Sequence, residues 1–386
     1  MQIAYAADKL WDGQRLIQRP ILLVENGRVL SIDSRDSREF PAGGVKLRDF
    51  GDVLLGPAFF DVHIHGAAGH DVMEGEEAAL AAIGAFLASR GTASYLATTV
   101  TASLDTTLRS LELLAKRIEA PARAGQAQPI GIHLEGPFLS HVRRGVHPPD
   151  KLLAPDIAVF DRMFEAAEGN VRLMTLAPEL PGAIELAAHA TARGVRISMG
   201  HSNALAAEAR AAIAAGATSA THTYNAMRPL DHREPGILGI ALTTDSLYAE
   251  LICDGIHSTA EMVKLWWRAK GPERALLVTD AMSATGMPDG TYQLGGFDVQ
   301  VADGRATANG VLAGSVLTLD RALANFVRFT GASVEQGLRL MTANPAAMTG
   351  LESQAGAIRA GEPASFVAVD STGKLVGSVI HGNLAI

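Results

Sequence analysis

Two histidines separated by a single residue, His63 and His65, follow an apolar run and could bind a metal ion together. In an extended strand, alternate side chains point to the same side. Both imidazoles can therefore face one point while Val62 and Ile64 pack the other way. Neutral imidazole binds Zn, Fe, Ni and similar cations. A lone His-x-His is a weak signal, because two strand histidines can also hydrogen-bond in place, so the pair alone leaves both interpretations open.

Other side chains able to bind a metal stand at the ends of further short apolar segments, far apart in the sequence. They are Glu135, His201, His222 and Asp280. In a β/α barrel the carboxyl ends of the strands meet at one face, where active sites lie. Histidines that only satisfy hydrogen bonds need not share such a position. The recurrence therefore predicts a metal site at the strand ends.

Three positions near this site have alternatives of their own. A carboxylate at the end of an apolar strand, such as Glu135, must be paired or bound to a cation, and a metal is the better partner. His133 alternates with Glu135 and either supports the site or packs inside the barrel. Asp280 is either a helix N-cap or, beside a metal-activated water, a proton acceptor.

The segments that position these residues alternate between short apolar runs and amphipathic stretches rich in Ala and Leu, which is typical of β/α units. The predicted strands are 53–65, 94–100, 130–135, 171–177, 195–201, 219–223, 248–254 and 275–280. The predicted helices are 76–90, 104–118, 183–193, 204–215 and 259–268, with two more near 315–329 and 333–342. Eight strands favour a (β/α)₈ TIM-like barrel over an open doubly wound sheet. The Gly-rich residues 284–313 interrupt the alternation and predict a β insertion or lid.

Both ends of the chain lack helical periodicity and predict short strands. These strands are 21–24, 29–32, 365–369 and 374–380. Asn26-Gly27 between the first two is a strong hairpin signal. Because isolated hairpins are marginally stable, we expect the two ends to pair in space. We therefore expect a small β-sandwich domain from residues 1–52 and 358–386, beside a barrel domain over residues 53–357.

Composition and charge narrow the class of protein. The chain has 386 residues, of which 48% are hydrophobic and 19% charged, which predicts a compact globule and excludes a disordered chain. A formal net charge of −8 gives no basic surface for nucleic acid or an anionic membrane, so we expect a small-molecule partner. A single cysteine, Cys253, excludes an internal disulfide and fits a reducing compartment. With neither a leader-like N-terminus nor a long apolar run, we expect a cytoplasmic protein.

A series of motifs in order along the chain resembles the amidohydrolase superfamily and, within it, the N-acetylglucosamine-6-phosphate deacetylases. The resemblance runs nearly end to end and is far more specific than any one motif. The motifs are His133-Leu134-Glu135-Gly136-Pro137-Phe138, Gly145-Val146-His147, Met199-Gly200-His201-Ser202, Thr221-His222-Thr223-Tyr224-Asn225-Ala226-Met227, Arg233-Glu234-Pro235-Gly236, Asp254-Gly255-Ile256-His257 and Thr279-Asp280-Ala281-Met282.

The resemblance implies a role for each matching residue. It implies that Glu135, His201 and His222 bind the principal metal and that Asp280 is the general acid and base. It implies that His147 polarises the acetyl carbonyl. The residues implied to hold the sugar phosphate and hydroxyls are Asn225, the backbone of Ala226, Arg233 and His257. Arg233 would reach the neighbouring active site of a homodimer; otherwise it is an ordinary surface charge, and Asn225 a turn residue.

The implied cofactor is one or two divalent metal ions per subunit, with zinc expected first and Fe, Mn or Co also compatible. Some members of the family lose the His-x-His and keep one metal, so His63 and His65, with Glu135, form an optional second site here. The fourth predicted strand, 171–177, has no lysine, which excludes a carbamylated lysine bridge and makes a dihydroorotase-like activity less suitable.

The expected reaction is hydrolysis of the acetamide of N-acetylglucosamine 6-phosphate to glucosamine 6-phosphate and acetate, in amino-sugar catabolism or cell-wall recycling. An N-acetylgalactosamine-6-phosphate deacetylase would share almost every residue named above, and an N-acyl-D-amino-acid deacylase is a further alternative. An alternative from a different functional class is a non-catalytic sugar-phosphate sensor built on the same barrel. The complete ligand set together with Asp280 argues against the sensor.

Overall fold

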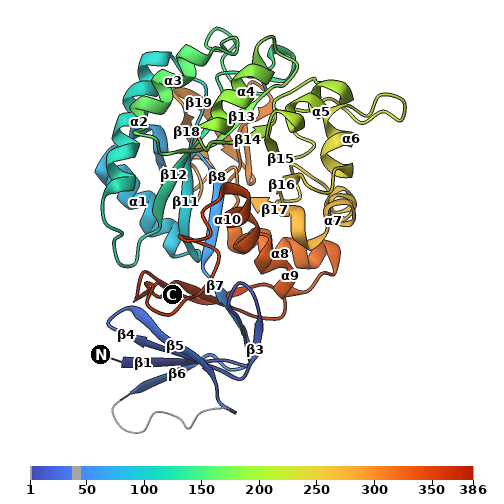
Figure 1. The fold of residues 1–386 in the computed structure, drawn as a ribbon. Helices are drawn as coiled ribbons and strands as arrows, with labels where there is room; N and C mark the ends of the chain where they lie inside the picture. The colour runs from blue at the N-terminus through green and yellow to red at the C-terminus, as the bar shows by residue number, and fades with distance from the viewer. Residues whose placement is uncertain (1, 37–44, 386) are drawn as a thin grey trace.

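The computed structural model describes residues 2–36 and 45–385. Both ends of the chain form two β-sheets that lie below the barrel in Figure 1. The four-stranded sheet has the order β5-β4-β1-β6, and the six-stranded sheet has the order β24-β23-β22-β7-β2-β3. The strands of the first sheet are β1 (Gln2–Ala6), β4 (Pro20–Glu25), β5 (Arg28–Ser34) and β6 (Lys46–Asp49). Those of the second are β2 (Lys9–Trp11), β3 (Leu16–Gln18), β7 (Leu54–Pro57), β22 (Phe366–Val369), β23 (Leu375–Ile380) and β24 (Asn383–Leu384).

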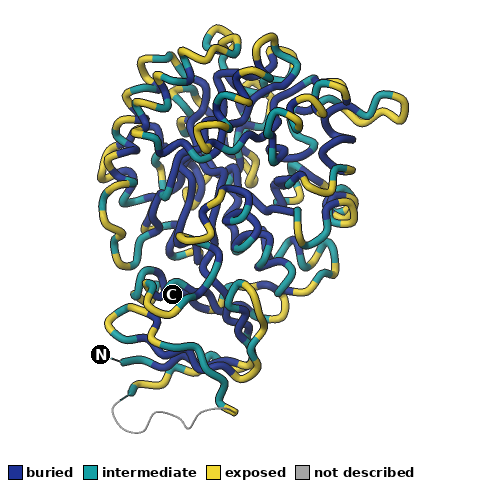
Figure 2. Tube along the Cα trace, viewed as in Figure 1, coloured by how far each residue is buried: buried dark blue, intermediate teal, exposed yellow. Residues whose placement is uncertain are grey.

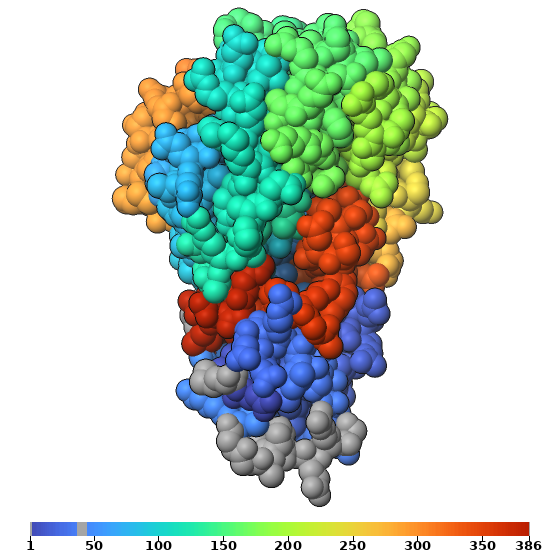
Figure 3. Space-filling model, turned by 60° about the vertical axis from the view of Figure 1, so that its left-hand side comes forward, coloured from blue at the N-terminus to red at the C-terminus, as the bar shows by residue number. Residues whose placement is uncertain are grey.

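The two sheets share one apolar core, as a β-sandwich requires. Tyr5 and Leu22 from the first sheet pack in one buried cluster with Leu55 and Phe366 from the second. The rings of Tyr5 and Phe366 meet edge to face with centroids 4.9 Å apart. In the space-filling view, the red C-terminal residues lie directly against the blue N-terminal ones (Figure 3). The predicted sandwich from both termini is confirmed.

The hairpin predicted at Asn26-Gly27 is confirmed. β4 and β5 pair antiparallel around it, and Asn26 and Gly27 have φ values of 50° and 77°. Two consecutive positive φ angles are what a two-residue turn of type I′ needs, and its twist matches that of the flanking strands.

Eight parallel strands form the barrel in the order β17-β16-β15-β14-β13-β12-β11-β8. They are β8 (Phe59–Ile64), β11 (Thr92–Thr99), β12 (Gln128–Glu135), β13 (Val171–Leu176), β14 (Arg196–Met199), β15 (Ala217–Ala220), β16 (Tyr248–Ile252) and β17 (Ala275–Val278). A parallel bridge between Ile64 and Ala281 closes the ring. Nearly all of these strand residues are buried, as the dark blue centre of Figure 2 shows. The predicted (β/α)₈ barrel is confirmed.

The helices lie around the strands (Figure 1). They are α1 (Glu77–Ala88), α2 (Leu104–Glu119), α3 (Ile157–Ala166), α4 (Ala183–Ala192), α5 (Ala206–Ala214), α6 (Gly236–Thr243), α7 (Ala260–Arg274), α8 (Leu319–Thr330), α9 (Val334–Arg339) and α10 (Ala343–Thr349), with short 3₁₀ turns η1 (Val72–Glu74) and η2 (His141–Arg143). The sequence did not predict α3, α6 or α10. In α6 every residue from Gly236 to Leu242 is buried, so the amphipathic period that reveals a helix is absent.

The prediction of one strand over residues 53–65 is wrong, because two strands of different sheets occupy it. The backbone N–H of Ala58 donates to Ser365 O, whereas the next N–H, of Phe59, donates to Gly91 O. Consecutive amides therefore bond to the terminal sheet and to the barrel. Pro57, which has no N–H to donate, ends β7. The chain thus passes from the sandwich into the first barrel strand at this point.

The β insertion predicted over residues 284–313 is confirmed as a four-stranded antiparallel sheet. Its strands are β18 (Gly290–Leu294), β19 (Phe297–Ala302), β20 (Arg305–Ala308) and β21 (Val311–Leu312), and two short strands, β9 (Gly66–Ala67) and β10 (His70–Asp71), follow β8. Leu294 and Val299 of the insertion pack against Val100 and Met282. Val100 directly follows β11, and Met282 lies in the loop after β17. The insertion therefore stands at the face of the barrel where the strands end.

Across the described ranges, 2–36 and 45–385, the structure has no helix with the length and apolar character needed to cross a bilayer.

Candidate metal centre and substrate cavity

The carboxylate of Glu135, the last residue of β12, lies at the centre of a ring of imidazoles. Its Oε1 is 3.4 Å from Nε2 of His63, 3.2 Å from that of His201 and 3.1 Å from that of His222. Its Oε2 is 3.2 Å from Nε2 of His65 and 3.6 Å from that of His147. Ligand atoms around a shared cation with bonds of about 2.0–2.2 Å have this spacing. The structure thus brings together all five metal ligands expected from the sequence.

The strand ends position these side chains through unusual backbone angles. His201, His222 and Asp280 follow β14, β15 and β17, with φ values of 46°, 28° and 51°. A left-handed φ in a residue other than glycine costs roughly 1–3 kcal/mol and persists only where the surroundings enforce it. Three such residues gathered at the same face of the barrel mark a site in which side-chain direction matters more than local stability.

Hydrogen bonds fix which nitrogen of the ligand histidines is free. Nδ1 of His65 lies 3.1 Å from Thr98 O, and Nδ1 of His201 lies 3.0 Å from Arg143 O. A carbonyl oxygen only accepts, so each Nδ1 carries a proton. In the neutral ring that metal binding requires, the Nε2 lone pair then faces Glu135. Nε2 of His201 is also 3.0 Å from Nε2 of His222. Lone pairs and carboxylate oxygens converging in this way suit a cation, so the donor set fits a divalent metal.

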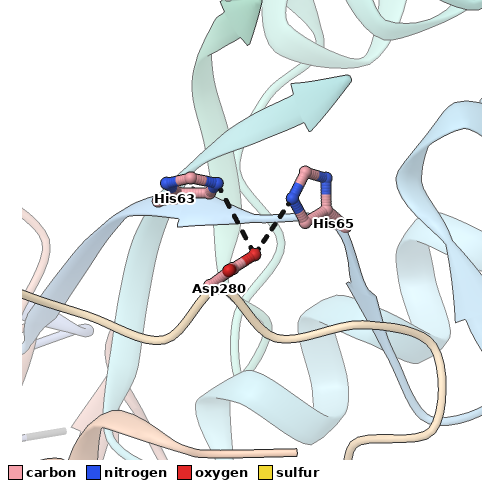
Figure 4. A group of neighbouring side chains, drawn as sticks. All are labelled: His63, His65 and Asp280. Atoms are coloured by element: carbon pink, nitrogen blue, oxygen red, sulfur yellow. Dashed lines mark ion pairs between the residues drawn. The ribbon is translucent and has the colours of Figure 1, made fainter. Parts of the chain in front are cut away.

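Asp280 extends this arrangement on the side of the first strand. Its Oδ1 lies 3.1 Å from Nε2 of His65 and 3.6 Å from Nε2 of His63. Figure 4 shows the imidazoles of His63, in β8, and of His65, just after it, directed towards this carboxylate. His63, His65 and Asp280 form one group of mutually close potential ligands, and Glu135, His147 and His201 form another. The residues present could therefore hold one cation at Glu135, His201 and His222 and a second at His63 and His65 with Glu135.

His147 differs from the metal ligands in the orientation of its protons. The backbone N–H of Thr101 points to Nδ1 of His147 at 3.3 Å, and the Thr101 hydroxyl lies 2.8 Å from the same nitrogen. An N–H can only donate, so Nδ1 holds the lone pair and the proton of the neutral ring is on Nε2. Although His147 lies close enough to Glu135 to be grouped as a ligand, its tautomer suits hydrogen-bond donation rather than metal binding.

Both central carboxyl groups are ionised at neutral pH. Burial raises the pKa of Glu135, but the charge of the neighbouring His63 and the close imidazoles of His147, His201 and His222 hold it well below the usual 4.5. Burial also raises the pKa of Asp280, while His63 and His65 hold it below 3.8. Asp280 is therefore an anion able to accept a proton.

A cavity of about 380 Å³ opens over these residues, within the range of small-molecule sites. The predicted site residues that line it are His65, Glu135, His147, His201, His222, Asn225, Ala226, His257 and Asp280. Val100, Val142 and Leu294 give it an apolar wall. Arg233 is not among the lining residues and is exposed in the loop before α6.

Several residues that support the site received no role from the sequence. Asp254 accepts from Nδ1 of His257 at 2.7 Å and from its backbone N–H at 2.8 Å, so it fixes the ring that faces the cavity. Thr101 fixes His147 by donating its backbone N–H to Nδ1 of that ring. Asp254 lies in the motif Asp254-Gly255-Ile256-His257, where an acidic residue three positions before a histidine was a usable signal. Thr101 offered no signal, because its partner is 46 residues away.

The chain is similar to known proteins over most of its length. The chain is 41% identical to the N-acetylgalactosamine-6-phosphate deacetylase of Escherichia coli O157:H7, over 86% of this chain and 88% of that protein. It is 37% identical to the N-acetylglucosamine-6-phosphate deacetylase of Bacillus subtilis (strain 168), over 86% of this chain and 85% of that protein.

A solved structure of a variant of the Mycobacterium smegmatis N-acetyl-D-glucosamine-6-phosphate deacetylase in complex with N-acetyl-D-glucosamine-6-phosphate superposes with a TM-score of 0.91 at 33% identity. The match covers 100% of this chain and 99% of that one. The model of the amidohydrolase family matches residues 54–385. Spanning the whole barrel and the C-terminal strands, this match shows that the chain belongs to the amidohydrolase family.

Proposed function

We propose that this protein hydrolyses the acetamide of N-acetylglucosamine 6-phosphate, giving glucosamine 6-phosphate and acetate. The observation that carries the proposal is the cavity in which the ionised Asp280 faces the Glu135 carboxylate and its imidazoles. Relatives that match most of the chain and bear this activity in their names support it.

Glu135, His201 and His222 would hold the principal divalent metal, and His63 and His65 with Glu135 a second one. When bound, such a metal lowers the pKa of water towards neutrality and polarises a carbonyl oxygen. We expect zinc first, with Fe, Mn or Co also compatible with imidazole and carboxylate ligands.

The protonation states of Asp280 and His147 indicate what each does in the reaction. Asp280, ionised in the cavity, takes a proton from the attacking water and delivers it to the departing amine nitrogen. The Nε2–H of His147 donates to the acetyl oxygen as negative charge develops there, because its Nδ1 is occupied by the Thr101 amide. A donor of this kind is worth about 10²–10³ in rate.

Substrate recognition is assigned to Asn225, the backbone of Ala226, His257 and Arg233. The first three line the cavity. Arg233 is exposed, which suits a guanidinium that binds phosphate bidentately in the neighbouring subunit of a homodimer.

We also propose that the protein is cytoplasmic, which the buried free thiol of Cys253 suits. We further propose that it has two domains, one formed by residues 1–52 and 358–386 and the other by residues 53–357.

N-acetylgalactosamine 6-phosphate is a second candidate substrate, because a relative of 41% identity is named for it. Acetate release from the two epimeric phosphates, from unphosphorylated N-acetylglucosamine and from an N-acetyl-D-amino acid, assayed side by side, tests the proposal. We expect N-acetylglucosamine 6-phosphate to have the highest kcat/KM. A higher value for the galacto epimer would reassign the substrate, and binding of either phosphate without acetate release would favour a sensor.

A further inference from the structure

One carboxylate in the barrel interior has no assigned role. Glu250, in the middle of β16, is completely buried. A buried carboxylate is costly unless hydrogen bonds or a cation compensate for its lost hydration. Nothing in the reaction above uses Glu250, so its partners in the interior indicate its purpose.

Those partners belong to the metal centre. Oε2 of Glu250 lies 3.3 Å from Nδ1 of His63 and accepts from the backbone N–H of His222, also at 3.3 Å. Its Oε1 has no hydrogen-bond partner among the described residues. One oxygen therefore contacts a ligand of each proposed cation, His63 through its ring and His222 through its backbone.

The contact with His63 sets the direction of its free nitrogen. A carboxylate oxygen accepts, so Nδ1 of His63 carries a proton and Nε2 faces Glu135 and Asp280 at 3.4 and 3.6 Å. His65 and His201 are held in the same tautomer by backbone carbonyls. Among these three, His63 alone is oriented by an ionisable side chain, and a carboxylate makes the ring a better donor to a metal than a carbonyl does.

We infer that Glu250 is a positioning residue that holds Nε2 of His63 towards the second cation and so determines whether that site fills. The inference rests on the proposed metal-dependent function and deepens it. Truncating or neutralising such a partner typically costs 10–100-fold in metal affinity. Glu250 itself does not line the cavity, so its substitution does not act on the substrate directly. A glutamine oxygen can still accept from the His222 N–H, so Glu250→Gln acts through His63.

The test is metal stoichiometry and affinity in Glu250→Gln, which keeps the size of the side chain and removes its charge. After dialysis against a buffer that holds free Co²⁺ at a low, fixed concentration, wild type should hold two equivalents per subunit. Glu250→Gln should hold close to one and bind the second 10–100-fold more weakly, with loss of that ion's visible absorption. Ser219→Ala is the matched control. Its side chain is buried on the neighbouring strand β15 and its hydroxyl has no hydrogen-bond partner among the described residues, so its metal content should equal that of wild type.

A double variant separates positioning from general damage. In the His63→Ala background, Glu250→Gln should lower metal affinity no further, because the ring that it orients is gone. Equal Co²⁺ content and spectra for wild type and Glu250→Gln would overturn the inference. A wild-type protein that holds one equivalent, unchanged by His63→Ala, would do the same. Acetate release by wild type reports separately on the proposed function. If Glu250→Gln does not fold, Glu250→Asp, which keeps the charge but is one methylene shorter, is measured instead, with second-site affinity again expected to fall.

Discussion

The hydroxyl of Thr279 donates a hydrogen bond of 2.6 Å to Oδ2 of Asp61, 218 residues earlier in the chain. This bond joins the first barrel strand, β8, to the residue after the last, β17. His63 and Asp280 stand immediately beyond it, and Asp280 N also bonds to His63 O. The closure of the barrel therefore fixes the distance between two groups of the metal centre.

Thr279→Val should destabilise the fold by about 1.5–3 kcal/mol, because a buried carboxylate loses a short hydrogen bond. Urea unfolding of the metal-free protein measures this free energy. Thr218→Val is the control. Its hydroxyl is half-buried on β15 and makes one contact of 3.5 Å to Ile197 O, so its effect should stay below about 0.5 kcal/mol. Equal effects for the two variants would show that the closure bond is unimportant.

His147→Gln should lower kcat by about 10²–10³ through loss of a donor to the developing oxyanion. It should leave the metal content unchanged, because the ring nitrogen that faces Glu135 carries a proton. His201→Ala, by contrast, should lose the principal metal. Elemental analysis of both purified variants beside their kinetics makes the comparison. Loss of metal from His147→Gln would make His147 a ligand and remove the argument from its tautomer.

Asp280→Asn should fold, retain the metal held by Glu135, His201 and His222, and lose most of its turnover. Proton transfer by a positioned group contributes about 10²–10⁴ in rate, and an amide cannot accept the proton. Single-turnover acetate release, with metal content measured on the same sample, tests this. Near-normal turnover would rule out Asp280 as the acid and base.

Asp254→Asn should move the pH dependence of KM. Burial lowers the pKa of His257, but its hydrogen bond to Asp254 and the charge of that carboxylate raise it above 6.5. The cationic ring that favours a phosphate therefore persists above pH 6.5 and is lost as pH rises through the raised pKa. Without the carboxylate, burial dominates and the pKa falls. KM for the phosphorylated sugar should then begin to rise at lower pH than in wild type.

The control for this shift is Asp156→Asn. Asp156 caps α3 by accepting from Val159 N, and asparagine caps a helix equally well. Its KM profile should match that of wild type. An unshifted profile in Asp254→Asn would mean that His257 does not bind the phosphate as a cation.

The sequence predicted those parts of the fold that have a local signal. Alternating apolar and amphipathic segments indicated the barrel, and Asn26-Gly27 indicated its hairpin. The passage from β7 to β8 was missed, because residues 53–60 on both sides of it are apolar and burial in two different sheets gives the same pattern as burial in one. α6 was missed for a related reason, since a helix that is buried all round has no polar face.

In the metal centre, the positions of Glu135, His201, His222 and Asp280 at the ends of predicted strands were enough to predict that they lie together. The role of Glu250 was not predicted, although a single acidic residue in the middle of an apolar strand was a usable signal. Its partner His63 is 187 residues away, and strand periodicity alone does not say which buried groups face each other across a barrel.

The most direct measurement is acetate release from N-acetylglucosamine 6-phosphate by one preparation in three states: as purified, stripped by a chelator, and reloaded with Zn²⁺. We expect turnover in the first state, its loss in the second and its return in the third, with one free amine formed per acetate. Undiminished turnover after the metal has been removed, or no acetate from any state, would contradict a metal-dependent deacetylase built around Glu135.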